Sequence, residues 1–282
     1  MLTGKALFNT LTTELKDIGL KGMAASLEEL YRSPQFLELD PLSAIARVVE
    51  PEYQAKINGR INNRLRTAHL FGCPQDIASC VDSADRTYLP TGITQVLSTL
   101  DFIENGLNVC VLGPSDSGKS YLAKALGIVA CANHRVGYNH CEALLEELVM
   151  LKSTDYAKYQ QRLKKTCGLD LLILDDFLLH TLTDEREVKL LFEILEKRSE
   201  MGLSTFTCSQ REPSSWSSMI LNDEVSANAI LKRVTKHYTV VIKPQTATEG
   251  WPLTQRKVAA GVTHLRPPAD AECKHTADVR VG

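Results

Sequence analysis

The residues best suited to chemistry form a short run of small and charged side chains, GPSDSGKS, at 113–120. Gly113, Gly118, Lys119 and Ser120 have the spacing G-x-x-x-x-G-K-[ST]. In such a loop the backbone N–H groups wrap phosphates, the lysine neutralises the outer phosphates, and the hydroxyl is a ligand for Mg²⁺. An apolar run precedes the loop and a helical pattern follows it, which is the strand–loop–helix context that phosphate binding requires.

The loop therefore predicts a bound nucleotide triphosphate, ATP with Mg²⁺. Its expected contacts are Gly113, Pro114, Ser115, Asp116, Ser117, Gly118, Lys119, Ser120 and Tyr121. Asp116 is unusual, because a carboxylate that faces the phosphates would cost about 1–3 kcal/mol. Backbone groups and not side chains build the phosphate nest, so Asp116 can point to solvent without loss of binding.

A second element, LLILDDF at 171–177, ends an apolar run in two carboxylates. A buried strand has this pattern when its carboxyl end reaches a ligand crevice. Asp175 would hold Mg²⁺, directly or through water, and Asp176 would orient or deprotonate the attacking water. Acidic residues also often begin loops, so the assignment depends on the phosphate loop upstream.

Two further positions are candidates for catalysis. In FTCSQ, a polar residue at the tip of a strand can hydrogen-bond the γ-phosphate or its water, and Gln210 is favoured over Ser209. The alternative is a simple turn residue. In ANAILKRV, Arg233 lies near the end of a helical pattern and could reach the γ-phosphate of a neighbouring subunit. The alternative is an ordinary surface arginine.

The elements that must position these residues alternate between short apolar runs and helical patterns. The expected strands are 107–113, 135–139, 169–177, 203–210 and 238–244. This alternation predicts an α/β fold, a parallel sheet with helices on both faces. The predicted organisation is an N-terminal helical domain (1–75), a connector (76–100), a P-loop ATPase domain (101–250) and a partly disordered C-terminal extension (251–282).

The N-terminal domain carries a basic stripe. Asp40 before Pro41 predicts the start of a helix that continues to about Leu70. In its second half a basic residue recurs every four positions beside an apolar stripe. Such a stripe could bind DNA phosphates, and a solvated helix face is the alternative. The predicted DNA-binding residues are Lys56, Arg60, Arg64 and Arg66.

The composition fits a globular protein of the cytoplasm. Of 282 residues, 44% are hydrophobic and 23% are charged, and the net charge of −2 gives no bulk attraction to nucleic acid. No run of about 18 apolar residues exists, so no membrane span is expected. The eight cysteines form no C-x-x-C pair and are expected to be reduced core thiols.

Four segments resemble, in the same order, those of the IstB-type transposition helper ATPases, which are AAA+ proteins related to DnaC-type helicase loaders. Along the chain they are GPSDSGKSYLAKALG, LDLLILDDF, TFTCSQREPSSW and ANAILKRV. The N-terminal LKDIGLKGMAASLEEL is also similar, so the resemblance covers about residues 10–243. It implies a protein that binds ATP, assembles as a homo-oligomer on duplex DNA and directs a partner transposase. It assigns Lys119 and Ser120 to nucleotide and Mg²⁺, Asp175 and Asp176 to the acidic pair, Gln210 to the strand-tip sensor and Arg233 to the trans-acting arginine.

The chain departs from the family pattern at three points. Asp116 replaces a usual glycine, Leu178 replaces a small residue, and past Pro244 only Arg256 is a candidate for a late arginine. These departures predict ATP binding with weak turnover. Two alternatives stay open: a nucleotide-binding scaffold with little hydrolysis, and a helicase loader. A loader that prefers single strands usually needs aromatic stacking residues, and the basic half of the helix has none.

Overall fold

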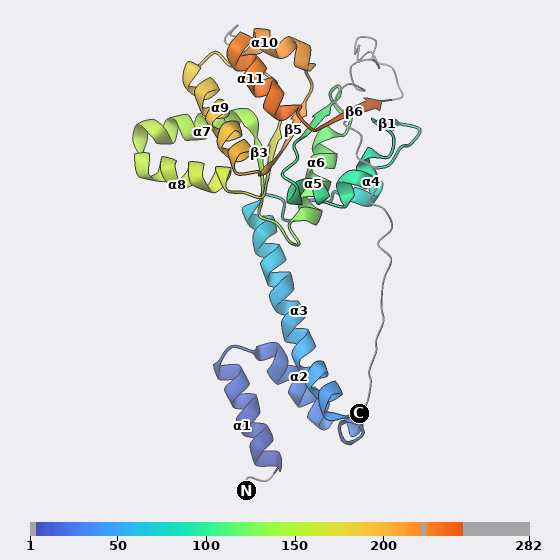
Figure 1. Cartoon of the computed structure of the whole chain (residues 1–282). Coiled ribbons are helices and arrows are strands. Elements are labelled where there is room, and N and C mark those ends of the chain that lie inside the picture. The colour runs from blue at the N-terminus through green and yellow to red at the C-terminus, as the bar shows by residue number, and fades with distance from the viewer. Residues whose placement is uncertain (1–3, 221–223, 245–282) are drawn as a thin grey trace, which may run out of the picture.

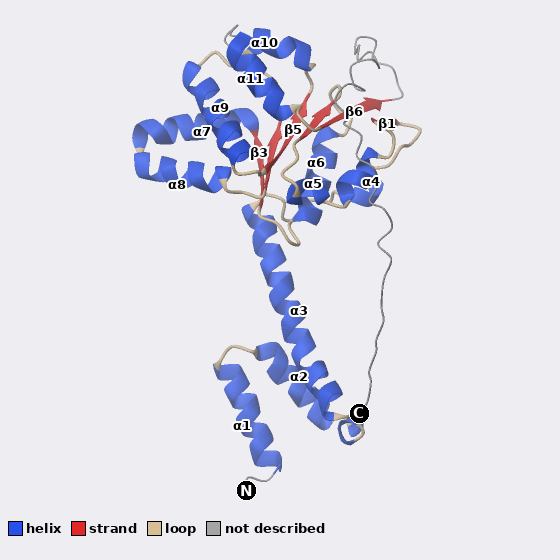
Figure 2. Cartoon of the chain, in the orientation of Figure 1, coloured by secondary structure: helices blue, strands red, loops and turns tan. Residues whose placement is uncertain are grey.

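The computed structural model describes residues 4–220 and 224–244. An α/β body and a small group of N-terminal helices lie at opposite ends of one long helix, α3 (Figure 1). Figure 2 shows that all the strands belong to the α/β body and that helices cover both faces of its sheet. The predicted C-terminal extension, including Arg256, lies outside the described residues.

The N-terminal helices are α1 (Gly4–Asp17), α2 (Lys21–Arg32) and the 3₁₀ turn η1 (Pro34–Leu37), so the predicted helical character is confirmed. Phe8 and Tyr31 stack with their ring centroids 4.2 Å apart and hold α1 against α2. The Gly22 amide donates a hydrogen bond to Glu52 Oε2 at 2.8 Å. A Cβ at Gly22 would lie 2.8 Å from the same oxygen and 3.3 Å from Glu52 Cα, so a larger residue would displace the Glu52 side chain and push α2 away from α3.

Helix α3 (Pro41–Thr67) forms the stem between the two ends of the molecule (Figure 1). Its predicted start is confirmed: Asp40 accepts hydrogen bonds from the amides of Leu42 and Ser43 at 3.0 and 3.1 Å. The other end enters the α/β body, where Arg64 Nη1 donates to the carbonyl of Ala132 at 2.5 Å. The stem is thus fixed to the body by specific bonds and not by packing alone.

The predicted connector forms regular elements: η2 (Ile77–Ser79), β1 (Arg86–Leu89) and α4 (Ile93–Ser98), followed by α5 (Asp101–Glu104). Strand β1, which the sequence did not predict, pairs antiparallel with the last strand, so the predicted parallel sheet carries one antiparallel strand at its edge. The sequence did not reveal β1 because it has four residues, of which only Tyr88 is buried.

All five predicted strands are present: β2 (Val109–Leu112), β3 (Val136–His140), β4 (Leu171–Asp175), β5 (Ser204–Ser209) and β6 (Tyr238–Pro244). The sheet order is β1-β6-β2-β5-β4-β3, and every pair except β1–β6 is parallel. Strands β2, β4 and β5 are buried along their whole length, which explains the apolar sequences of β2 and β4. Strand β5 also buries the polar side chains of its Ser and Thr residues.

Helices pack on both faces of the sheet and create two buried cores. Those after β2 are α6 (Lys119–Ala130), α7 (Cys141–Thr154), α8 (Tyr156–Cys167), α9 (Glu185–Glu200), η3 (Pro213–Ser215), α10 (Trp216–Met219) and α11 (Glu224–Val234). One core contains residues from α7 to α11, and the other contains residues from α4, α5, α6 and the end of the stem. Ala68 and Leu70, just past α3, belong to the second core.

The cysteines behave as expected within the described residues. Seven of them are free thiols, and all but Cys73 are buried; Cys273 lies outside the described part. Among the described helices, none combines the length and the apolarity that crossing a membrane requires.

Arg198 in α9 is a fully buried cation that ties this helix to the sheet. Its guanidinium donates to the carbonyls of Cys167 and Leu169 at 3.0 and 2.8 Å, to the carbonyl of Ser204, and to Thr205 Oγ1 at 3.0 Å. Burial lowers the pKa of Arg198 to about 10, so the side chain still carries its charge at neutral pH. These bonds fix the amino ends of β4 and β5.

Replacing Arg198 by Met should lower the free energy of unfolding by about 3–5 kcal/mol, because the buried carbonyls lose their donor. Urea unfolding measures this change. The matched control is Lys197→Met, which removes a half-exposed neighbour paired with Glu193 and should change stability by less than about 0.5 kcal/mol. Equal effects of the two substitutions would contradict this role for Arg198.

Candidate nucleotide-binding site

The predicted phosphate loop joins β2 to α6 where the parallel strands have their carboxyl ends, a side of the sheet called here the carboxyl edge. The Gly113 amide donates to the Ser209 carbonyl at 3.3 Å, which anchors the start of the loop to β5. Gly118 has φ 100°, a conformation that L side chains rarely adopt, immediately before the first turn of α6. A Cβ at Gly113 would lie 2.6 Å from Ser117 Oγ and 2.7 Å from the Ile242 carbonyl. A side chain would therefore clash at Gly113 and strain the backbone at Gly118.

Lys119 lies folded into the loop. Its Nζ donates to the Pro114 carbonyl at 2.6 Å. Burial lowers the pKa of Lys119, and the carboxylates of Asp175, Asp176 and Asp116 act in the opposite direction. Lys119 and the acidic pair are thus close enough to interact, as they must be if they bind the same ligand.

Ser117 supports the fit of an anionic ligand to this loop. The residue is buried at 2% exposure, and its hydroxyl has no hydrogen-bond partner among the described residues. An unsatisfied buried donor is costly, and a phosphate oxygen held by the loop would satisfy it. Burial of Ser117 and Lys119 is therefore consistent with a loop shaped for phosphate.

Asp116 occupies the tip of the loop. Its φ is 59°, in the left-handed region that Asp tolerates better than most residues. Its side chain is exposed, as is that of Ser115. The expectation that the carboxylate can point away from the phosphate nest agrees with this exposure.

The acidic pair ends β4, and two residues from β3 hold it. Asp175 is buried at 1% exposure and accepts hydrogen bonds from the Tyr138 hydroxyl and from the Asp176 amide, the latter at 3.0 Å. His140 Nδ1 lies 3.0 Å from Asp176 Oδ2. Burial and the hydrogen bond to Asp175 raise the pKa of Tyr138, so its phenol stays a donor. Sequence reasoning did not identify Tyr138 or His140.

Strand β5 lies between β2 and β4 and brings the two motifs to one edge. Leu112 pairs with Ser209, and the Phe177 amide donates to the Cys208 carbonyl at 2.7 Å. Cys208 Sγ in turn donates to the Lys119 carbonyl at 3.6 Å. The phosphate loop, the tip of β5 and the acidic pair therefore share one rigid platform.

Gln210 follows β5 directly and is half-buried. Its competitor Ser209 is fully buried, and Ser209 Oγ accepts a hydrogen bond from the Arg211 amide at 3.1 Å. Since the Ser209 hydroxyl is engaged in the turn, Gln210 is the better placed candidate for contact with a phosphate or its water.

The donor types at this edge fit Mg²⁺. Ser120 and Asp175 supply a hydroxyl and a carboxylate, and Mg²⁺ binds through oxygen while keeping several waters. Among the described residues there is no group of three or more His, Cys, Asp and Glu that could hold a metal alone, so a metal here would also need phosphate oxygens. Bound Mg²⁺ would supply charge neutralisation between phosphates.

Arg233 lies at the amino edge of the sheet, where the parallel strands begin. Asn108, just before β2, donates from Nδ2 to the Arg233 carbonyl at 2.7 Å, so Arg233 is near the start of β2 whereas the phosphate loop follows its end. The guanidinium forms an ion pair with Glu196 and lies 4.7 Å from the centroid of the Phe192 ring. Its place excludes contact with the loop of the same subunit.

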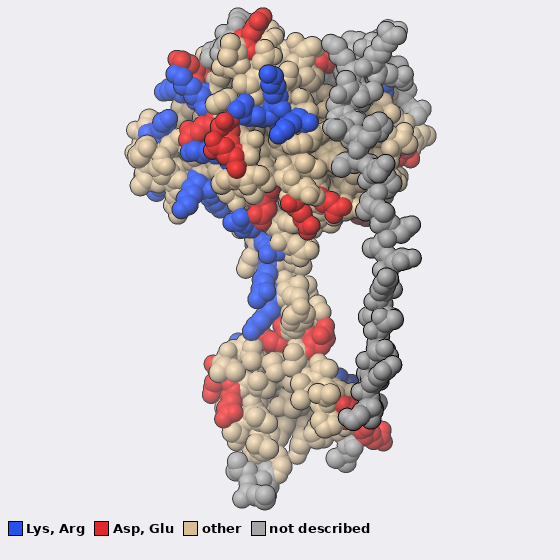
Figure 3. All heavy atoms as spheres, in the orientation of Figure 1, with Lys and Arg blue, Asp and Glu red and all other residues tan. Residues whose placement is uncertain are grey.

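The four predicted DNA-binding residues lie along the stem, where Figure 3 shows basic side chains on one side of α3. Lys56 and Arg60 are exposed, and Lys56 Nζ is 3.8 Å from Glu52. Arg64 instead donates to the carbonyls at the end of α6, and Arg66 lies 4.4 Å over the Phe71 ring. The stripe is present, but two of its four members also have contacts within the chain.

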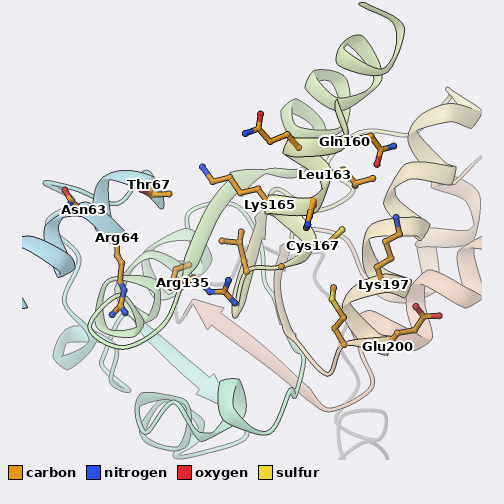
Figure 4. A pocket seen from close by; sticks show the side chains of 16 residues that line it. Asn63, Arg64, Thr67, Arg135, Gln160, Leu163, Lys165, Cys167, Lys197 and Glu200 are labelled. Atoms are coloured by element: carbon orange, nitrogen blue, oxygen red, sulfur yellow. The ribbon is translucent and has the colours of Figure 1, made fainter. Parts of the chain in front are cut away.

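A cavity of about 960 Å³ lies where the stem meets the amino edge of the sheet (Figure 4). It is distant from the phosphate loop, since its walls include Val136 at the start of β3 and Leu169 before β4. Helix α3 contributes Asn63, Arg64 and Thr67, and α8 contributes the exposed Lys164 and Lys165. The basic side of the stem thus continues into a recess of the α/β body.

The sequence of residues 13–257 matches the family described as IstB-like ATP binding protein. The chain belongs to this family. The resemblance expected from the motifs is therefore confirmed.

Relatives and a solved structure agree with this assignment. The insertion sequence ATP-binding protein y4uH of Sinorhizobium fredii is 35% identical over 78% of this chain and 86% of its own length. The insertion sequence IS232 ATP-binding protein of Bacillus thuringiensis is 30% identical over 83% and 91%. A crystal structure of a DNA replication initiation factor aligns with 60% of this chain and 50% of that one, at a TM-score of 0.50 and 18% identity, which supports the fold alone.

Replacing Asp116 by Asn should tighten ATP binding by no more than about threefold, because solvent screens the exposed carboxylate and Asn keeps a side chain that tolerates the left-handed backbone. Titration with a fluorescent ATP analogue measures the dissociation constant. Ser115→Ala in the same loop is the control and should have little effect, because Ser115 is exposed and backbone groups build the nest. Weaker binding by Asp116→Asn would mean that the carboxylate assists the nucleotide.

Proposed function

We propose that this protein is an ATP-dependent, DNA-binding helper of transposition that oligomerises on duplex DNA and directs or stimulates a partner transposase. The printed names of the relatives connect them to insertion sequences, which supports the transposition context. The observation that carries the proposal is the separation of two half-sites in one subunit. Lys119, Asp175 and Asp176 meet at one edge of the sheet, while Arg233 lies at the other.

Hydrolysis would use residues of two neighbouring subunits. Asp176, held by His140, orients or deprotonates a water for in-line attack on the γ-phosphorus, and the bond to the β–γ bridging oxygen breaks. Lys119 neutralises charge on the transferred group, and Gln210 positions the water or the γ-phosphate. Arg233 of the adjacent subunit stabilises the charge that develops in the transition state. Arg233 would exchange its partner Glu196 for the neighbour's phosphate when subunits assemble.

Shared active sites predict complementation between two inactive variants. Lys119→Ala should lose ATP binding, and Arg233→Ala should bind ATP but release phosphate at least about a thousandfold more slowly than wild type. A mixture of the two should recover part of the activity, because some interfaces combine an intact loop with an intact arginine. Phosphate release with and without duplex DNA measures the outcome.

The control mixes Lys119→Ala with Asp176→Asn, since both lesions fall on the same half-site and no intact interface can form. Recovery in that control, or no recovery in the Arg233 mixture despite normal assembly, would contradict a trans-acting Arg233. ATP binding without any phosphate release by the wild type would instead favour a nucleotide-binding scaffold.

DNA would lie along the basic side of α3 and continue toward the recess lined by Lys164 and Lys165. The interaction should be tolerant of sequence, because lysine and arginine would contact phosphates and not base edges.

A specific feature favours testing the helicase-loader alternative as well. Tyr53 is 56% exposed on the same helix as Lys56, and an aromatic ring there could stack on unpaired bases.

Replacing Lys56 and Arg60 by Ala should weaken binding to duplex DNA uniformly across sequences and reduce the salt slope of log K by about 1 for each residue. Fluorescence anisotropy at several salt concentrations measures both quantities. Lys189→Ala, an exposed lysine on α9, is the matched control. An unchanged slope would refute phosphate contacts by the stripe, and a preference for single strands that Tyr53→Ala removes would support a loader.

A further inference from the structure

Arg86 in β1 lies against the phosphate loop. A Cβ added to Gly118 would collide with Arg86 Nη1 and would lie 3.5 Å from its Cζ and 4.0 Å from its Cδ. The guanidinium therefore covers the glycine that immediately precedes Lys119. No sequence motif identified this residue, because it comes from the segment expected to be a connector.

The surroundings of Arg86 include a phenol but no carboxylate that forms an ion pair with it. Burial raises the pKa of the Tyr88 phenol, and the nearby Arg86 guanidinium acts in the opposite direction, so the two side chains are close enough to interact. None of the ion pairs among the described residues includes Arg86. The nearby carboxylate Asp82 accepts from the Tyr88 amide at 2.7 Å and serves the backbone instead. A half-buried arginine usually pairs with an anion, and here none is supplied by the described residues.

The electrostatics of the loop explain what this cation would attract. Lys119 and Arg86 place two positive groups next to the N-terminus of α6, whose free N–H groups add further positive potential. Such a concentration is unfavourable without an anion and favourable with one. The planar guanidinium also matches the oxygen atoms of a phosphate, which it can bind through two donors.

We propose that Arg86 is a second nucleotide-binding cation that contacts the phosphates of bound ATP or ADP beside Gly118. The inference rests on nucleotide binding at this loop, but it does not require hydrolysis, DNA or a partner protein. It gives β1 a function: pairing of Arg86 with Pro244 of β6 fixes the arginine at the carboxyl edge of the sheet, level with the loop. The ligand class is the polyphosphate and not the base.

The test compares ATP, ADP and adenosine as ligands of the full chain. Arg86→Ala should weaken binding of ATP and of ADP about tenfold or more and leave binding of adenosine unchanged, because a charge-assisted hydrogen bond to phosphate is lost. Arg86→Lys should restore part of the affinity, since it keeps the charge without the fork. The matched control is Arg32→Ala, an exposed arginine at the end of α2, which should bind all three ligands like wild type.

A second variant separates contact from folding. Tyr88→Phe removes the hydroxyl close to Arg86 and should weaken ATP binding less than Arg86→Ala does, again without an effect on adenosine. Thermal unfolding of the ligand-free variants monitors the fold. The inference is overturned if Arg86→Ala binds ATP like wild type, or if affinity for adenosine falls by the same factor as affinity for ATP. Failure of the unsubstituted protein to bind ATP would refute the nucleotide site itself, which distinguishes the two failures.

Discussion

The parallel ladder of β2, β5 and β4 is the constraint on which the candidate site depends. Each strand is short and buried along its whole length, so its backbone must pair completely and its side chains, including the Ser and Thr residues of β5, are enclosed by the protein. Polar groups that are free to contact a ligand can lie only where the strands stop. Because the three strands stop at one edge, the phosphate loop, Gln210 and the acidic pair meet there without any direct sequence proximity.

Helix α6 extends this constraint to the stem. Its first turn follows the phosphate loop, and just past its end the carbonyls of Cys131 and Ala132 accept hydrogen bonds from Arg64 of α3. The Tyr138 amide also donates to the Ala68 carbonyl at 3.1 Å, so the end of the stem is joined to the strand that holds the acidic pair. A continuous series of backbone and side-chain hydrogen bonds therefore connects the basic helix α3 to the carboxyl edge of the sheet.

The sequence was sufficient for the elements with strong local signals and insufficient for contacts between strands. Short apolar runs that alternate with helical patterns identified all five parallel strands, and Asp40 with Pro41 identified the start of α3. Strand β1 was missed because its four residues alone do not indicate a strand. It is a strand because it pairs in register with β6. Tyr138, His140 and Arg86 were missed for the same reason: their partners lie more than thirty residues away and depend on the order of strands in the sheet.

The position of Arg233 follows from the connectivity of the same sheet. Parallel strands must all begin at the edge opposite the site, so the helix that precedes β6 ends at that edge and leaves its last turn there. A cation in the last turn of a helix is favourable in any case, and Glu196 and Phe192 hold it within the subunit. An arginine fixed at the amino edge cannot reach a phosphate held at the carboxyl edge of its own sheet. In the function proposed above, the phosphate that Arg233 contacts therefore belongs to another subunit, and assembly is a condition of catalysis.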